Sequence, residues 1–220
     1  MCQSSFREYS NIKRDDRDYK AGVNMTPSSK FDIASLKSRL LPADSILPIE
    51  GLGPPVAAVA IVINPKERDG TVLLIKRMER VGDPWSGQVA FPGGHIGRGD
   101  RTLSETAIRE AREEVGIELR KHKMLGVLPV LHARSGRAVV TPFVFELSRN
   151  VRVRLNEEVA ESFWAPLVEL GELQVSKSEV QVEEENITVD SYIYRGRIIW
   201  GITFRIINML LNRTHRSSLQ

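Results

Sequence analysis

The residues of this chain best suited to chemistry are the three glutamates Glu110, Glu113 and Glu114. Spaced i, i+3 and i+4, they would share one face of a helix, where each like-charged pair costs about 0.2–0.5 kcal/mol. A divalent cation would offset that repulsion, and carboxylate oxygens suit Mg²⁺ or Mn²⁺. The alternative is a solvated acidic face balanced by Arg109 and Arg112.

A helix that would position these glutamates is predicted over Leu103–Val115. Thr102 followed by Glu105 predicts a capping box at its start, which accounts for Glu105 without a catalytic role. Gly116 suits the left-handed residue that ends a helix. Ile108 flanks a predicted buried stripe whose members recur every four residues: Leu103, Ala107, Ala111 and Val115.

Apolar runs on both sides of this helix predict strands. They are Val56–Asn64, Val72–Arg77, Gly87–Phe91, Met124–Leu131, Ala138–Leu147 and Ser162–Ala165, followed by a hairpin over Val180–Tyr194. A buried or half-buried helix is predicted over Trp200–Leu211. The mixture of strands with a central and a terminal helix indicates an α/β or α+β fold.

Composition divides the chain into four parts. Residues 1–29 are polar and poor in branched aliphatic side chains, which predicts a disordered tail. Residues 30–50 predict a short helix and a proline-containing linker. We expect the catalytic domain over residues 51–212 and a C-terminal tail over residues 213–220.

Charge and composition narrow the classes of partner. The net charge of +3 and a pI near 9.1 favour anionic ligands but are too weak to indicate nucleic-acid binding. No apolar run has the length of a membrane span. The single cysteine, Cys2, excludes an intramolecular disulfide, so we expect a cytoplasmic protein. The sequence leaves the oligomeric state open, and a homodimer is one alternative.

The glutamates belong to a longer motif. Two glycines, Gly93-Gly94, are followed by a loop and then by Arg109-Glu110-Ala111-x-Glu113-Glu114-Val115-Gly116-Ile117, which resembles the Nudix box. The coenzyme A pyrophosphatase branch of that family is resembled by Gly87-Gln88-Val89-x-Phe91-Pro92-Gly93-Gly94 and by Trp200-Gly201-Ile202-Thr203. The likeness covers about residues 56–211.

This resemblance implies a Nudix-type mixed β-sheet between helices and hydrolysis of a nucleoside diphosphate derivative. It implies Mg²⁺ or Mn²⁺ held by Glu110, Glu113, Glu114 and the backbone carbonyl of Gly94. It also implies that Arg109 pairs with a box glutamate and orients it, which completes the candidate catalytic set. A box glutamate is one alternative for the general base; a later glutamate, Glu158 or Glu161, is the other.

The same resemblance suggests that coenzyme A or an acyl derivative is cleaved to 3′,5′-ADP and a 4′-phosphopantetheine product. Arg77 and Arg80 are the candidate substrate-binding residues, because guanidinium groups bind phosphates bidentately. Two departures concern the loop before the helix: Arg101 replaces a glutamate of the common pattern, and Gly97 replaces an acid that is frequent in the branch. The alternatives are a Nudix pyrophosphatase acting on ADP-ribose or dinucleotides and a non-catalytic Nudix-fold binding module.

Overall fold

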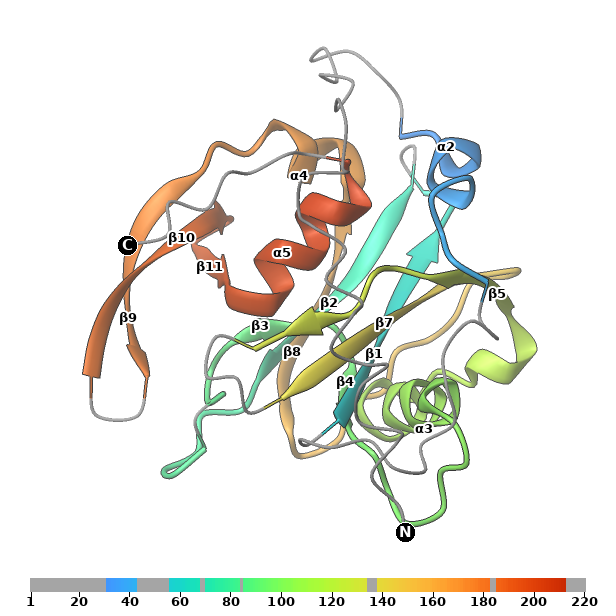
Figure 1. The fold of residues 1–220 in the computed structure, drawn as a ribbon, viewed down its shortest axis with the longest axis horizontal. Coiled ribbons are helices and arrows are strands. Elements are labelled where there is room, and N and C mark those ends of the chain that lie inside the picture. Colours follow the sequence, from blue (N-terminus) through green and yellow to red (C-terminus); the bar gives the residue numbers. More distant parts are fainter. Residues whose placement is uncertain are drawn as a thin grey trace, which may run out of the picture.

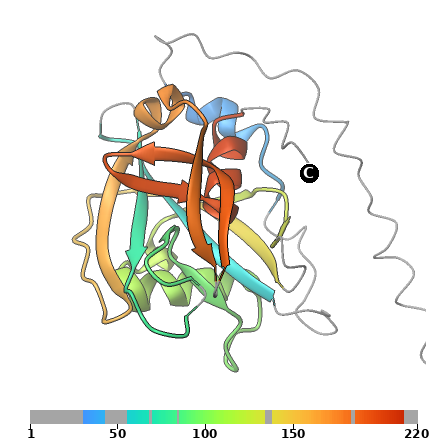
Figure 2. The ribbon, with the colours of Figure 1, turned by 90° about the vertical axis from the view of Figure 1, so that its left-hand side faces the viewer.

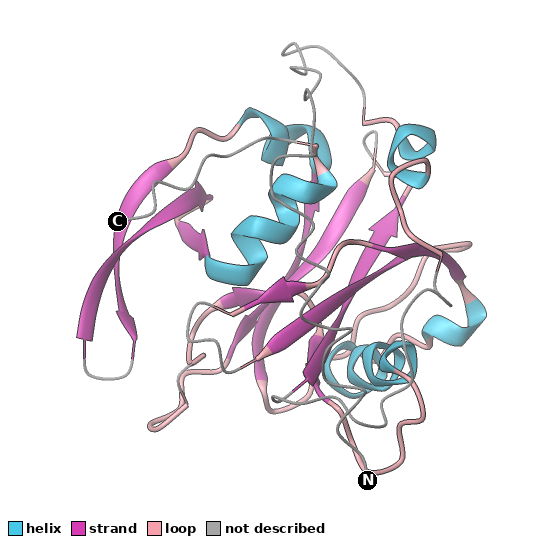
Figure 3. Cartoon of the chain, in the orientation of Figure 1, coloured by secondary structure: helices cyan, strands magenta, loops and turns pink. Residues whose placement is uncertain are grey.

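The fold consists of a large sheet, a small sheet and a few helices (Figures 1 and 3). It comes from a computed structural model that describes residues 31–42, 56–67, 70–83, 85–133, 138–182 and 185–212. The predicted tails over residues 1–29 and 213–220 lie outside these ranges. The predicted mixture of strands and helices is confirmed.

The large sheet has eight strands. Its main path runs β3-β2-β1-β7-β5, while β4 pairs with β1, β6 with β7 and β8 with β2. β1 and β7 are parallel and the other pairs are antiparallel, which makes the sheet mixed, as the sequence predicted. The strands are β1 Val56–Asn64, β2 Thr71–Arg77, β3 Val89–Ala90, β4 Gly93–His95, β5 Lys123–Val127, β6 Leu131–His132, β7 Val139–Glu146 and β8 Val159–Pro166.

Both faces of the large sheet are buried. Successive side chains of a strand point to opposite faces, so Ile61 and Ile63 of β1 join one core cluster and Ala60 and Val62 join the other. The second cluster includes the helix α3, Leu103–Val115. The first includes residues of α2 (Ile33–Lys37), α4 (Leu167–Glu172), α5 (Gly201–Leu210) and the small sheet. Figures 1 and 2 show these elements around the large sheet.

The small sheet has three strands in the order β11-β10-β9. β9 (Ser176–Val182) and β10 (Glu185–Tyr194) form a hairpin that ends at Tyr194 as predicted but begins at Ser176, before the predicted start at Val180. The third strand, β11 (Arg197–Trp200), was not predicted, because it runs directly into α5 and its apolar residues merge with those of the helix. A tight turn at Arg195 and Gly196, both with positive φ, connects β10 to β11.

Several predicted strands have the wrong extent. β8 spans Val159–Pro166, beyond the predicted Ser162–Ala165 at both ends. The segment Met124–Leu131 is not continuous: β5 ends at Val127, and Leu131–His132 is a separate strand. The register shifts before Gly126, whose φ is +147°, and Pro129, which has no N–H to donate, follows at once. Only Val89–Ala90 of the predicted Gly87–Phe91 strand is paired, as β3.

Residues 31–42 pack on the domain. Leu36 of α2 is fully buried in the core. The Arg39 guanidinium donates to the carbonyls of Met209 and Leu210 at 2.8 and 3.1 Å, and Leu41 forms an isolated bridge with Val127. This segment therefore joins α5 to β5. The predicted linker beyond it, residues 43–50, lies outside the described residues.

The end of α3 offers a test of the fold. Gly116 adopts φ +70°, and a Cβ there would lie 3.1 Å from the Cβ of Arg154. We expect Gly116→Ala to lower the free energy of unfolding by about 1–2 kcal/mol, the cost of a left-handed non-glycine residue. About 1 kcal/mol corresponds to roughly 2–4 °C in melting temperature for a chain of this size. Gly99→Ala is the matched control, because its Cβ would meet no atom within 4 Å; equal melting temperatures for the two variants would contradict the prediction.

Candidate metal and catalytic site

The start of α3 follows the predicted capping pattern with one change. The Thr102 hydroxyl accepts from the Glu105 amide at 3.2 Å, as predicted. The Glu105 carboxylate accepts from the amide of Arg101 at 2.8 Å, and not from the amide of Thr102 itself. The Arg101 amide lies just before the helix and has no intrahelical partner, so this bond still satisfies an open donor.

The three box glutamates differ sharply in burial. The side chain of Glu114 is 2% exposed and that of Glu110 is 14% exposed, whereas that of Glu113 is 47% exposed. Helical spacing gives all three the same general direction. Of the three, Glu110 and Glu114 are the ones that the sheet covers, because they approach Gly93 and Gly94 of β4. They are therefore the buried part of the cluster.

The first two residues of β4, Gly93 and Gly94, bring backbone against both buried carboxylates. The Gly93 amide donates to Glu114 Oε2 at 2.9 Å. A Cβ at Gly93 would lie 2.5 Å from the Ala58 carbonyl oxygen, and one at Gly94 would lie 2.4 Å from Glu110 Oε1. Gly93 is required by close approach to the backbone of β1, whereas a side chain at Gly94 would displace the Glu110 carboxylate.

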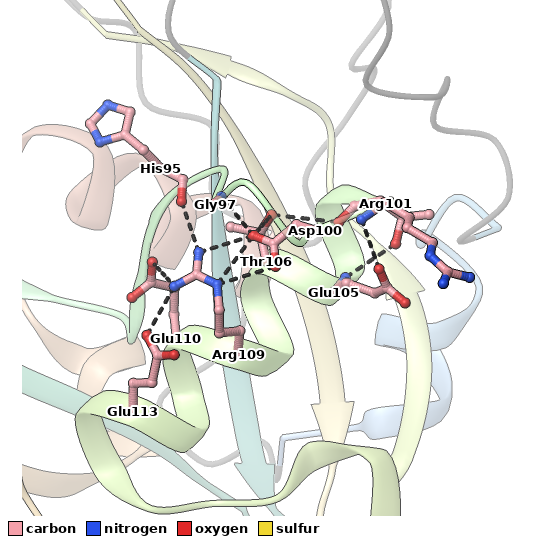
Figure 4. A network of polar contacts seen from close by, with 10 residues as sticks. His95, Gly97, Asp100, Arg101, Glu105, Thr106, Arg109, Glu110 and Glu113 are labelled. Carbon is pink, nitrogen blue, oxygen red and sulfur yellow. Dashed lines mark hydrogen bonds and ion pairs between the residues drawn. The ribbon is translucent and has the colours of Figure 1, made fainter.

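Arg109 is surrounded by acceptors (Figure 4). Its Nη1 donates to Glu110 Oε1 at 2.8 Å and to Glu113 Oε2 at 2.9 Å. Its Nε and Nη2 donate to the Asp100 carboxylate at 3.0–3.2 Å, and Nη2 also donates to the His95 carbonyl at 2.9 Å. The arginine thus connects two box glutamates to the loop before α3.

Asp100, in the loop before α3, is also part of this network. Its carboxylate also accepts from the Gly97 amide at 2.8 Å and from the Thr106 hydroxyl at 2.9 Å. Burial alone would raise the pKa of Asp100, but the hydrogen bonds from Arg109, Gly97 and Thr106 hold it below its ordinary value. The only signal available in the sequence was an acid nine residues before Arg109, and such a spacing across a loop fixes no contact.

Burial raises the pKa of both inner glutamates. The pKa of Glu114 is raised to about 8, mainly by burial, with further increases from Glu110 and Glu158 and opposing decreases from the Gly93 amide and Arg77. Burial also raises the pKa of Glu110, although Arg109 lowers it. These carboxyl groups lack sufficient compensating positive charge, which is the condition that a bound cation would correct.

The two later glutamates that were candidates for the general base lie in different surroundings. The charge of Glu158 contributes to raising the pKa of both Glu110 and Glu114, so it lies close enough to act on the buried pair electrostatically. Glu161 lies within β8 and is ion-paired with Arg197. Of these two later residues, Glu158 is the one that the fold brings near the box glutamates.

The two candidate phosphate-binding arginines also separate. Arg77 Nη2 donates to Asp83 at 3.1 Å, and its Nη1 lies 3.7 Å from Glu114 Oε1. Among the described residues, its buried Nε has no hydrogen-bond partner. Arg80 is exposed and donates to the Glu157 carbonyl at 2.9 Å. Asp83, which sequence reasoning did not single out, thus anchors Arg77 beside Glu114.

The residues fit a divalent cation only in part as they stand. Within the described ranges, no three carboxylate, histidine or cysteine side chains already converge on one cation position. The Glu113 carboxylate is directed to Arg109 instead. Glu110 and Glu114 do fit, because they are buried carboxyl groups with a raised pKa, and their oxygens are hard ligands. A third side-chain ligand from α3 would require Glu113 to leave Arg109.

An open cavity of about 430 Å³ lies on a different face of α3 from the buried pair. Its lining includes Arg101, Ile108, Arg109 and Arg112 but neither Glu110 nor Glu114. Residues 101, 105, 108, 109 and 112 share one helical face, and positions 110 and 114 share another. This cavity therefore leaves out the buried pair Glu110 and Glu114, although Arg109 borders it.

The raised pKa of Glu114 predicts how stability depends on pH without metal. Between the ordinary pKa of 4.5 and about 8, the folded protein binds more protons at this site than the unfolded chain. Its stability therefore falls as the pH rises through this window. In EDTA, we expect the melting temperature of Glu114→Gln, relative to wild type, to increase between about pH 6 and about pH 9, because the amide cannot ionise.

Glu105→Gln is the control for this measurement, since Glu105 is more exposed and lies outside the buried pair. Its melting temperature relative to wild type should not follow the same trend. A difference between Glu114→Gln and wild type that stayed constant with pH would show that Glu114 ionises normally in the folded protein.

Known proteins resemble this chain across the site. In the described part of the chain, no helix is both long and apolar enough to cross a bilayer. The NUDIX domain family model matches residues 53–185. The uncharacterized Nudix hydrolase NudL of Pectobacterium atrosepticum is 36% identical over 168 residues, which is 76% of this chain and 85% of the relative. NudL of Photorhabdus laumondii is 38% identical over 152 residues, which is 68% and 79% of the two chains.

Solved structures are similar to this chain at lower identity. The binary complex of a C. elegans Ap4A hydrolase is 21% identical with a TM-score of 0.43, covering 50% of this chain and 80% of its own. The NUDIX domain of Shewanella oneidensis NrtR with ADP ribose is 19% identical with a TM-score of 0.44, covering 63% and 86%. Neither likeness says what this chain acts on. The family match extends across β4 and α3. Together with the NudL relatives, it shows that the chain belongs to the Nudix hydrolase family.

Proposed function

We propose that this Nudix hydrolase is a Mg²⁺- or Mn²⁺-dependent diphosphatase whose substrate is coenzyme A or an acyl derivative. The metal-dependent part rests on the pair of buried glutamates, Glu110 and Glu114, which lie against Gly93 and Gly94 of β4. Both carboxyl groups are buried and have a raised pKa, so a bound cation would neutralise their charge favourably. The reaction adds water across the diphosphate, giving 3′,5′-ADP and 4′-phosphopantetheine or its acyl form.

In this proposal, Glu110 and Glu114 hold the cation, with Glu113 and the Gly94 carbonyl as further ligands. When bound, the ion supplies polarisation of the phosphoryl oxygens and makes water more acidic. Arg109 orients the carboxylate of Glu110 through its 2.8 Å hydrogen bond.

Glu158 accepts the proton of the attacking water in this scheme, because its charge acts on both buried carboxyl groups from outside α3. Arg77, 3.7 Å from Glu114 and with an unpartnered Nε among the described residues, stabilises charge on the scissile diphosphate. The exposed Arg80 contacts the 3′-phosphate of coenzyme A, since a phosphate at the rim needs a cation open to solvent.

The carboxylate assignment is tested by replacing one oxygen. Glu110→Gln and Glu114→Gln should each reduce kcat by at least about a hundredfold, because an amide is a weaker ligand for a hard cation. Circular dichroism should show an intact fold, since these changes remove like-charge repulsion. Glu105→Gln should retain activity, because the Gln carbonyl can still accept from Arg101. Near wild-type turnover of Glu114→Gln at saturating Mg²⁺ would refute the assignment.

The substrate is tested by a panel of coenzyme A, dephospho-coenzyme A, ADP-ribose, NADH and dinucleoside polyphosphates, with product identification. We expect kcat/KM for coenzyme A to exceed that for its dephospho form by about tenfold, the low end for a charged hydrogen bond of roughly 1.5–3 kcal/mol. Arg80→Ala should shrink this gap. Arg195→Ala, which removes an exposed arginine of the β10–β11 turn, should preserve it.

Preference for ADP-ribose or a dinucleotide would reject coenzyme A as the substrate and leave the metal site standing. Turnover of no diphosphate with either metal would favour a binding module over an enzyme. The two outcomes are distinguishable, because only the first yields a hydrolysis product.

A further inference from the structure

The loop between β2 and β3 holds a tryptophan in the open. The side chain of Trp85 is 48% exposed, although tryptophan is usually highly buried. Its ring lies 5.9 Å from the imidazole of His95, centroid to centroid, at an interplanar angle of 53°. Because the two rings are tilted and do not stack face to face, the indole keeps free area for another planar group.

Hydrogen bonds within the loop hold the backbone that carries this ring. The Asp83 carboxylate accepts from the Trp85 amide at 2.9 Å, and the Asp83 carbonyl accepts from the Ser86 amide at 3.0 Å. The Ser86 hydroxyl in turn accepts from the Arg80 amide at 2.9 Å. The backbone around Trp85 is thus fixed before any ligand binds, which reduces the entropy lost on binding.

Two connections link the ring to the buried glutamates. Asp83 binds Arg77 at 3.1 Å, and Arg77 faces Glu114 at 3.7 Å. On the other side, His95 follows Gly94, at which a Cβ would lie 2.4 Å from Glu110 Oε1. Consecutive Cα atoms are about 3.8 Å apart. In Figure 4 the imidazole of His95 points away from the Arg109 network while its carbonyl faces that arginine. The Trp85–His95 pair therefore borders the glutamate cluster.

We propose that Trp85 and His95 form an aromatic ledge that binds the nucleobase of the substrate. This inference rests on the proposed function, because it assumes that the scissile diphosphate lies at Glu110 and Glu114. A nucleobase joined through ribose to that diphosphate would extend outward to the rim, where the ledge lies. Any base can stack on an aromatic face, so the ledge contributes affinity without selecting one base.

An extended acyl chain fits this surface less well. Alkyl chains gain most from an enclosed apolar groove, whereas Trp85 presents an open ring. The cavity of about 430 Å³ in the described residues is lined by α3 and its neighbouring loops and does not include Trp85. The observations therefore favour a planar heteroaromatic ring as the occupant.

The test compares AMP with ribose 5-phosphate by isothermal titration calorimetry on the full chain with Mg²⁺. We expect Trp85→Ala to weaken AMP binding by about tenfold, within the range for loss of one base–aromatic stack. Trp85→Phe should restore most of the affinity, and ribose 5-phosphate should bind all three proteins equally. Val81→Ala is the matched control, because Val81 is a fully exposed apolar residue of the same loop without a ring.

Unchanged AMP affinity in Trp85→Ala would overturn the proposal. Equal weakening of AMP and ribose 5-phosphate would also overturn it, because it would indicate a disturbed loop and no base contact. These outcomes are independent of turnover. If Trp85→Ala weakens AMP binding but the protein does not hydrolyse coenzyme A, the ledge stands and coenzyme A is rejected as the substrate. If the protein hydrolyses coenzyme A but Trp85→Ala leaves AMP affinity unchanged, the substrate stands and the ledge is rejected.

Discussion

The close approach between α3 and Gly93 and Gly94 of β4 is the constraint on which the rest of the site depends. The Gly93 amide donates to Glu114, and the Gly94 backbone leaves no space for a Cβ beside Glu110. This approach requires small residues elsewhere too: Ala58 and Ala60 of β1 pack in the same cluster as Ala107 and Ala111 of α3. The buried carboxylates are a consequence of a helix that lies very close to its sheet.

Charge around the site is distributed unevenly. Arg109 is shared among Asp100, Glu110 and Glu113, while Glu114 has only a distant guanidinium, that of Arg77 at 3.7 Å. Burial therefore raises the pKa of Glu114 to about 8. The hydrogen bonds of Arg109 fix the loop before α3. The buried Glu114 carboxylate is left with little compensating positive charge, which a bound cation would supply. Structural and chemical tasks thus fall to different members of one acidic cluster.

Much of the fold followed from local patterns. The bounds of α3 matched its Thr102 and Gly116 caps, and β1 matched its continuous apolar run, because a strand buried on both faces carries no polar positions. The errors occurred where tertiary pairing decided the outcome. Pro129 and the bulge at Gly126 divided β5 from β6, and β11 exists only because β10 offers it a partner.

The sequence by itself determined the helix, its caps, its buried stripe and the common direction of Glu110, Glu113 and Glu114, since helical periodicity fixes angles around an axis. It also marked Gly93 and Gly94 through a family motif. Only the tertiary structure decided that Glu114 is buried while Glu113 is exposed, and that Asp83 holds Arg77. It also set Trp85 beside His95. Such contacts join residues on different elements, and spacing along a chain carries no information about distances across loops.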